Sequence, residues 1–147
     1  MKKRGDECRC IRCREIKGLA PLGKPEISVL EYQASSGTEH FISINDDRDK
    51  LIGFCRLRTP SSSAKHFKDS SLLREIHVYG HSVQIGKKGA GSSVQHRGYG
   101  KQLMKKAEEI TLAHGLSKIA VISGVGVRDY FRKLGYELVG TYMIKKL

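Results

Sequence analysis

Residues 94–110 read VQHRGYGKQLMKKAEEI, and this stretch decides the fold. Its glycines, Gly98 and Gly100, stand at the start of a helix that the spacing of apolar residues predicts over 100–114. Because glycine has no Cβ, backbone N–H groups at a helix start can close around an anion, which the helix dipole also favours. Two basic side chains beside the glycines would complete the neutralisation, Arg97 and Lys101. The pattern predicts a diphosphate site or, alternatively, a glycine-softened turn without a ligand. Its spacing fits neither a P-loop nor a dinucleotide fingerprint.

Short β-prone runs and a second helical pattern surround this stretch. Strands are expected at 27–34, 39–44, 51–58 and 72–80. The continuous apolar run 118–123 is typical of a strand covered on both faces, and one or two strands close the chain. A second helix is expected to bury one face, made of Val127, Tyr130, Phe131 and Leu134. The order of elements predicts an α+β or α/β sandwich around a mixed sheet, whose first three strands form an antiparallel meander.

The strand at 72–80 carries two sets of alternating side chains. One face is expected to present Glu75, His77 and Tyr79, and the other Arg74, Ile76 and Val78. Glu75 and His77 are candidates for holding a water molecule or acting as a general base, or they form a surface pair with no chemical role.

Composition sets the class of protein. The 147 residues are enough for one compact domain, and 39% hydrophobic with 29% charged residues is ordinary for a soluble globular chain. No apolar run approaches the roughly 20 residues of a membrane span, and the basic N-terminus has no apolar stretch behind it, so we expect a cytoplasmic protein that does not bind membranes. The net charge of +12 concentrates at both ends and around residues 84–106, as expected if anionic partners bind there. A solvated basic surface is the alternative.

Three of the 4 cysteines fall within six residues, Cys8, Cys10 and Cys13. With no secretory signal, metal binding is favoured over disulfides, and zinc accepts four thiolate or imidazole ligands. Cys55, His40 or a partner group would supply the fourth ligand; three reduced thiols without metal are the alternative. We therefore divide the chain into a Cys-rich basic segment, 1–24, with a probable zinc site, and a main domain, 25–147.

The segment QHRGYG, residues 95–100, resembles the acyl-CoA loop of the GNAT acetyltransferase superfamily, with its pattern Q/R-x-x-G-x-G/A. More narrowly, REIHVYG, QHRGYGKQLM, KIAVISGVGVRDYFRKLGYEL and GTYMIKKL are similar, in this order, to the acetyltransferase domain of the Elongator catalytic subunit family. CRCIRCRE resembles the link that precedes this domain. It lacks the C-x3-C-x2-C spacing of the family's radical S-adenosylmethionine domain, and the resemblance suggests a zinc site instead.

The resemblance implies the GNAT fold, a mixed, splayed sheet flanked by helices, with acetyl-CoA as the cofactor. It implies that the backbone of Glu75, Ile76, His77 and Val78 pairs with the pantetheine arm. It also implies that the loop and helix start hold the pyrophosphate through Gln95, Arg97, Gly98, Tyr99, Gly100 and Lys101. Tyr130 is expected to contact the cofactor and give a proton to the departing CoA thiolate. Many relatives carry this tyrosine one position later, where this chain has Phe131.

The family uses a radical S-adenosylmethionine domain to modify the wobble uridine of tRNA, and that domain needs well over 200 residues. We therefore expect an acetyl-CoA-dependent enzyme that releases the acetyl group for this modification, as a piece of a longer enzyme or as a stand-alone unit. Its expected partners are tRNA and a radical domain in cis or trans. Two alternatives remain. One is an N-acetyltransferase for protein lysine or a small amine, favoured by a carboxylate-rich pocket. The other is a non-catalytic module that binds CoA and RNA, favoured if Tyr130 points into the core.

Overall fold

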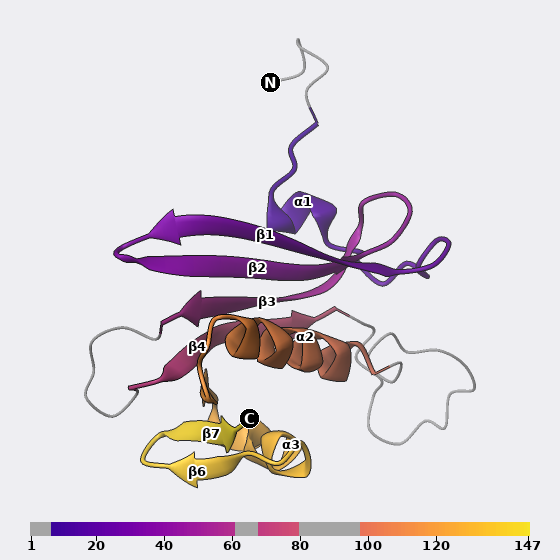
Figure 1. The fold of residues 1–147 in the computed structure, drawn as a ribbon. Coiled ribbons are helices and arrows are strands. Elements are labelled where there is room, and N and C mark those ends of the chain that lie inside the picture. Colours follow the sequence, from indigo (N-terminus) through magenta and orange to yellow (C-terminus); the bar gives the residue numbers. More distant parts are fainter. Residues whose placement is uncertain (1–6, 61–67, 80–97) are drawn as a thin grey trace, which may run out of the picture.

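The computed structural model describes residues 7–60, 68–79 and 98–147. Its described strands form a 7-stranded sheet in the order β1-β2-β3-β4-β5-β7-β6. The strands are β1 (Glu26–Ala34), β2 (Gly37–Asn45), β3 (Leu51–Thr59), β4 (Ser70–Val78), β5 (Lys118–Ile122), β6 (Glu137–Val139) and β7 (Tyr142–Lys146). The helices are α1 (Ile11–Arg14), α2 (Tyr99–Ala113), the 3-10 turn η3 (Val125–Val127) and α3 (Arg128–Lys133). Figure 1 shows the hairpin of β6 and β7 lying with α3 beyond β4.

The sheet is mixed, as predicted. β1 to β4 pair antiparallel in sequence order, which confirms the meander. The β1–β2 turn is tight because Ser35 and Ser36 adopt left-handed backbone conformations, with φ of 48° and 62°. β5 then pairs parallel to β4, after the crossover through α2. Ile119, Ala120 and Val121 are all buried, so the strand is covered on both faces as expected.

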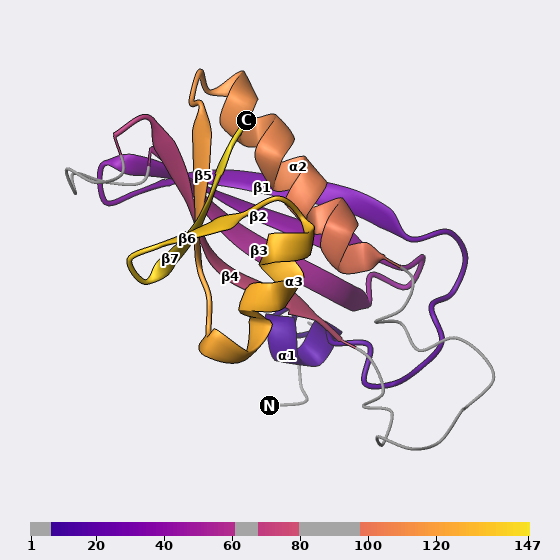
Figure 2. The ribbon, with the colours of Figure 1, turned by 90° about the horizontal axis from the view of Figure 1, so that it is seen from below.

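One face of the sheet, here called the helix face, packs against α2. It carries Ile42 of β2 and Cys55 of β3, which are neighbours across the two strands and are fully buried. From α2, Leu103 and Ala107 reach the same core, and Figure 2 shows the helix lying along the strands. Full burial of a leucine such as Leu103 contributes about 2 kcal/mol, so the predicted amphipathic pattern is sufficient to dock α2 on the sheet.

The opposite face, here called the open face, carries Phe41, Phe54 and His77. A β-bulge in β4 interrupts the simple alternation of its side chains between the two faces. Arg56 pairs with Glu75, whereas the next residue of β3, Leu57, pairs with Leu73, which leaves Arg74 as the extra residue.

The bulge corrects one expectation about β4. Arg74 does not share a face with Ile76 and Val78; its guanidinium donates to Glu39 Oε1 at 2.8 Å, and Glu39 also binds Arg58. Periodicity alone assumes an uninterrupted pleat, so it placed Arg74 on the wrong face.

The Cys-rich segment is joined to the main domain by more than its chain connection. Ile16 is fully buried in the core, and its N–H donates to Leu51 O at 3.1 Å. Arg14 donates to Asp49 Oδ1 at 2.7 Å. The division at residue 24 stays a prediction. None of the described helices is both long and apolar enough to cross a bilayer.

Candidate active site

A cleft opens where β4 and β5 separate. β4 pairs with β5 only through Ser70–Leu73, so in the described part of the chain no strand occupies the β5 side of its second half. The cleft has a volume of about 700 Å³. Its lining comes from β4, the start of α2 and the η3–α3 segment: Ile76, Val78, Gly98, Gly100, Lys101, Val127, Tyr130 and Phe131. A strand edge with unpaired backbone groups beside a cavity can take an extended ligand by strand addition.

The start of α2 forms one wall of this cleft. Gly98 is its N-cap, with φ of 74°, a left-handed conformation that costs other residues roughly 1–2 kcal/mol. No side chain of the described residues caps the helix and its first turn has no acidic residue, so within this part of the chain its first N–H groups can bind another acceptor. With the helix dipole and Lys101, this end of α2 can bind an anion.

Gly100 lies against Tyr130. A Cβ at Gly100 would stand 2.7 Å from the Tyr130 hydroxyl oxygen, with Val78 Cγ2 the next side chain at 3.8 Å. Any side chain at this position would therefore displace the hydroxyl. The second glycine is required by close approach, whereas Gly98 is required by backbone conformation.

Tyr130 lies at the cleft and is 37% exposed. Its ring meets Phe131 edge-on at 5.3 Å between centroids, and partial burial raises the pKa of its hydroxyl. A phenol with a raised pKa keeps its proton at neutral pH, as a proton donor must.

The predicted buried face of the second helix is wrong in part. Phe131 is buried, but Val127 is 49% exposed and lines the cleft with Tyr130. The reason is that the first turn is the 3-10 turn η3 and α3 spans only 6 residues, so the four positions do not form one continuous stripe.

Glu75 and His77 lie on the open face, as their shared strand face predicted. His77 Nε2 is 3.0 Å from Glu75 Oε1, and Arg56 Nε is 3.2 Å from Glu75 Oε2. The His77 ring also packs on Phe54 and stacks on Tyr79. Their side chains are thus on the other side of β4 from Ile76 and Val78, while their backbone belongs to the strand edge at the cleft.

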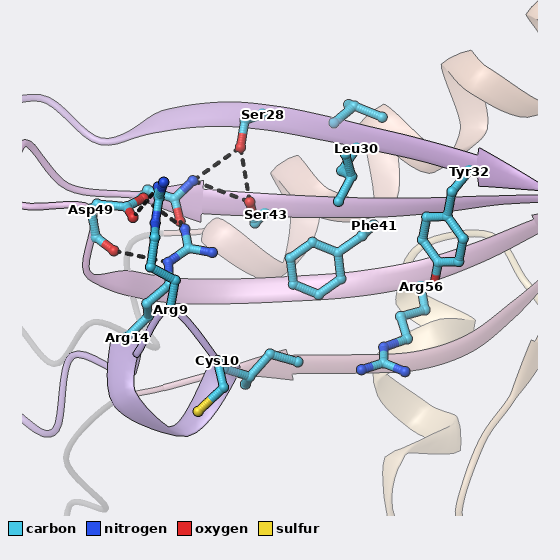
Figure 3. Close-up of a pocket in the computed structure, with 13 residues that line it drawn as sticks. Arg9, Cys10, Arg14, Ser28, Leu30, Tyr32, Phe41, Ser43, Asp49 and Arg56 are labelled. Atoms are coloured by element: carbon cyan, nitrogen blue, oxygen red, sulfur yellow. Dashed lines mark hydrogen bonds and ion pairs between the residues drawn. The ribbon is translucent and has the colours of Figure 1, made fainter. Parts of the chain in front are cut away.

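A second cleft, of about 650 Å³, lies on the open face beside α1. Figure 3 shows Phe41, Tyr32 and Arg56 at one end of it, where the Arg56 guanidinium lies 6.0 Å from the Phe41 ring centre. At the other end Arg9 and Arg14 bind the Asp49 carboxylate. This surface offers aromatic rings and cations, and its one described carboxylate is neutralised by two arginines. It is not the carboxylate-rich pocket that a protein-lysine or amine acceptor favours.

The three thiols of the Cys-rich segment lie together. The sulfur atoms of Cys8, Cys10 and Cys13 are all within 4.8 Å of one another and exposed. Tetrahedral zinc with bonds of about 2.3 Å holds sulfur atoms about 3.8 Å apart, so small rotations suffice and the donor set fits zinc. The pKa of Cys10 is lowered to about 7, chiefly by the backbone N–H of Cys13 and then by the two neighbouring thiols.

The expectation that Cys55 or His40 completes this set is wrong. Cys55 is buried under α2, with its sulfur 4.0 Å from Leu103 O, and burial raises its pKa to about 12. His40 is buried at another cluster, with Glu31 and His114. The sequence did not reveal which elements cover either residue. A partner group remains for the fourth position.

The structure therefore gathers part of the predicted cofactor set. Ile76, Val78, Gly98, Gly100, Lys101 and Tyr130 all line the cleft. Tyr99 is buried in the core and does not line the cleft. Gln95 and Arg97 lie outside the described residues. Sequence reasoning had placed Val127 and Phe131 in the core only, because the helical pattern does not distinguish a core face from a cleft wall.

These features are those of an acyl-CoA-dependent transferase, and the chain belongs to the acetyltransferase (GNAT) family, whose model matches residues 12–136. An acetyltransferase of the GNAT family from Staphylococcus aureus has a TM-score of 0.52 at 13% identity, covering 74% of this chain and 68% of its own, and supports the fold alone.

Relatives with a higher sequence identity narrow the assignment within this family. The chain is 44% identical to the tRNA uridine(34) acetyltransferase of Dehalococcoides mccartyi and 44% identical to Elongator complex protein 3 of Danio rerio, with all of this chain covered in both. The structure of Methanocaldococcus infernus Elp3 with an N-terminal deletion has a TM-score of 0.86 at 43% identity and also covers the whole chain. The chain spans only 34%, 28% and 37% of these three relatives, respectively.

Proposed function

We propose that this chain binds acetyl-CoA in the cleft between β4 and β5 and releases the acetyl group for modification of the wobble uridine of tRNA. The observation that carries the proposal is the cleft itself, which joins a strand edge and a helix start that no described residue pairs with or caps, together with the Tyr130 hydroxyl. Two curated relatives that carry the name tRNA uridine(34) acetyltransferase, at 44% and 46% identity, support the choice of acceptor.

Each side of the cleft has one task in this proposal. The backbone of residues 75–78 pairs with the pantetheine arm, as an added strand would. The N–H groups at the start of α2 and the Lys101 ammonium bind the diphosphate. Tyr130, whose phenol is protonated at neutral pH, gives its proton to the thiolate of the leaving CoA.

The acceptor, or the water that attacks the thioester, approaches from the open face in this proposal. Glu75 and His77 stand there on the far side of the same strand edge, 3.0 Å apart. Either carboxylate or imidazole can take the proton from the attacking group. The aromatic and arginine side chains of the second cleft provide room beside them for a nucleotide.

We propose in addition that Cys8, Cys10 and Cys13 hold a zinc ion with one ligand from a partner group. Zinc would fix the Cys-rich segment, which already binds Asp49 through two arginines. Elemental analysis of protein purified without chelator should find at least about half an equivalent more zinc in the unaltered chain than in a Cys8→Ser, Cys10→Ser, Cys13→Ser variant. Freely titratable thiols with less zinc would contradict the site.

The remaining two thirds of the relatives' length lies outside this chain. We propose that a radical S-adenosylmethionine domain, in cis or in trans, performs the radical step, and that this chain contributes the acetyl group and part of the tRNA surface. A cytoplasmic location, where tRNA meets a reducing environment, belongs to the same proposal.

The decisive experiment follows release of free CoA by chromatography, with and without tRNA. We expect turnover that depends on tRNA, and calorimetric binding of acetyl-CoA that is lost when both Gly98 and Gly100 are replaced by bulkier residues. The double variant Gly124→Ala, Gly126→Ala is the control, because a Cβ at either position meets nothing within 4 Å. Turnover stimulated by a lysine peptide or small amine but not by tRNA would instead identify an N-acetyltransferase. Binding without turnover under any condition would identify a non-catalytic module.

Binding of tRNA is expected to be weak, largely independent of sequence and strongly salt-dependent, because phosphate contacts release counterions. Deleting residues 1–16 would remove buried Ile16, so neutralising Lys2, Lys3, Arg4 and Arg12 is the better test. Filter binding should show a flatter dependence of affinity on salt, by several units of slope if all four contact phosphates. An unchanged slope, or no tRNA binding at low salt, would favour the N-acetyltransferase.

A further inference from the structure

Three side chains from separate elements converge at the end of α2 that is remote from the acetyl-CoA cleft. They are Glu31 of β1, His40 of β2 and His114, which follows the last turn of α2. Their ligand atoms all lie within 4.8 Å of one another. The His40 and His114 rings meet edge-on, with centroids 4.9 Å apart and planes at 75°. The acetyl-CoA cleft uses none of these three residues.

His40 is only 1% exposed, yet only one of its two ring nitrogens has a hydrogen-bond partner among the described residues. Its Nε2 is 2.8 Å from the Thr59 hydroxyl oxygen, a good hydrogen bond. Its Nδ1 is fully buried and has no hydrogen-bond partner among the described residues. Glu31 Oε2 lies 3.4 Å from Nδ1, but the two atoms do not form a hydrogen bond. A buried nitrogen left in this state costs free energy unless something binds it.

Protonation of His40 is disfavoured, so a positive charge on the ring does not stabilise its buried Nδ1 beside Glu31. Burial lowers the pKa of its imidazole, and the neighbouring His114 lowers it further, although Glu31 acts in the other direction. A neutral ring that carries its proton on Nε2 can donate to the Thr59 hydroxyl oxygen, and it then presents the lone pair of Nδ1 to a carboxylate and a second imidazole. A lone pair facing a carboxylate is repelled, whereas a cation between them is attracted to both.

We propose that Glu31, His40 and His114 form a binding site for a divalent transition-metal ion, with zinc as the best match. Neutral imidazole nitrogens and a carboxylate are common zinc ligands, and three protein ligands leave one position for water. The Thr59 hydroxyl at His40 Nε2 can accept the proton of that nitrogen and so orient an imidazole that binds the metal through Nδ1. The site differs in chemistry from the thiol cluster, which has only sulfur donors.

Geometry and local charge both favour this site. Ligand atoms around tetrahedral zinc stand about 3.3 Å apart. His40 is held rigidly, but Glu31 and His114 are exposed and can turn inward to close the remaining gap. The last turn of α2 contains no basic residue, so its partly negative carbonyl end also attracts a cation. A bound ion would tie the end of α2 to the β1–β2 hairpin.

The test uses zinc itself and a variant without the competing thiol cluster, Cys8→Ser, Cys10→Ser, Cys13→Ser. Calorimetric titration of this metal-free variant should show one equivalent of bound zinc and a rise in Tm of several degrees. Adding His114→Ala or Glu31→Gln should weaken binding at least tenfold and remove the rise. Glu109→Gln, which removes an exposed carboxylate of α2 that is not part of the cluster, is the matched control and should leave both the affinity and the rise in Tm unchanged.

Binding of cobalt(II) to the protein with its thiol cluster intact provides a second measurement. Two equivalents should bind, and only one should produce thiolate charge-transfer absorption, so this arm holds even if the serine variant fails to fold. Zinc binding that is absent, or unaffected by both His114→Ala and Glu31→Gln, would overturn the proposal. Acetyl-CoA affinity should be the same in all these variants, because the cleft lies at the opposite end of α2.

Discussion

Replacing Gly100 by alanine should reduce catalysis through Tyr130 without unfolding the protein. The new Cβ would lie 2.7 Å from the Tyr130 hydroxyl oxygen, whereas an ordinary contact between carbon and oxygen is about 3.4 Å. The hydroxyl must therefore move by about 0.7 Å. Alanine stabilises a helix by about 0.5–1 kcal/mol relative to glycine, and pushing a side chain off its rotamer costs about as much. The two effects nearly cancel, so Tm should stay within about 2 °C.

The effect on rate should be much larger. A misplacement of about 1 Å at a reacting group can cost about 100-fold, so we expect Gly100→Ala to slow CoA release at saturating acetyl-CoA by at least about tenfold. Tyr130→Phe should cost about 100-fold or more, as loss of a general acid does. Without the hydroxyl, the nearest tyrosine atom to the Cβ is Cζ at 3.6 Å, which is an ordinary contact. Adding Gly100→Ala to Tyr130→Phe should therefore cost nothing further.

Single-turnover release of CoA from the four members of this double-mutant cycle provides the measurement. Gly126→Ala is the control, since its Cβ would meet no atom within 4 Å. An equal loss from Gly100→Ala in both backgrounds would refute the reasoning, because the alanine would then act on the cofactor directly. Wild-type rates in Tyr130→Phe would remove Tyr130 from the mechanism altogether.

Three further substitutions or treatments test other parts of the structure. The buried Asp46 carboxylate accepts three backbone N–H bonds and an arginine, which lower its pKa although burial alone would raise it. Asp46→Asn should cost about 2–3 kcal/mol in urea unfolding at pH 7, and this difference should vanish as pH falls from about 4 through the lowered pKa. Glu108→Gln removes the acceptor charge shared by a tyrosine and a lysine and should cost about 1–2 kcal/mol, against less than about 0.5 for exposed Glu109→Gln. Iodoacetamide should alkylate Cys10 increasingly as pH rises through about 7, and buried Cys55 not at all by mass spectrometry; zinc should protect Cys10.

Local patterns predicted the elements well because each pattern is set by neighbours in sequence. The apolar repeat that docks α2 and the continuous run of β5 both report burial directly, and the structure buries Leu103 and Val121 as expected. The glycines at the start of α2 were equally predictable from the sequence, since the left-handed N-cap conformation at Gly98 favours glycine in any fold.

Contacts between distant segments could not be read in the same way. Val127 looked like a core residue because its helical spacing is correct, and only the separation of β4 from β5 turns that surface into a cleft wall. The cluster of Glu31, His40 and His114 has no spacing motif, since its members come from three elements. Cys55 was a plausible zinc ligand by type alone, and the sheet places it beneath α2 instead.

The bulge at Arg74 decides which side chains face the cleft that we propose binds acetyl-CoA. Leu73 lies on the helix face. In an uninterrupted strand every second residue shares a face, so Glu75 and His77 would lie on the helix face too. The extra residue reverses the alternation, so Ile76 and Val78 enter the cleft instead. An apolar wall can pack against a pantetheine arm without desolvating a charge, while the side chains of Glu75 and His77 remain on the open face, where we propose that the acceptor arrives. Alternation within residues 75–79 is the same with or without the bulge, which is why sequence periodicity grouped these residues correctly and still could not say which group meets the cofactor.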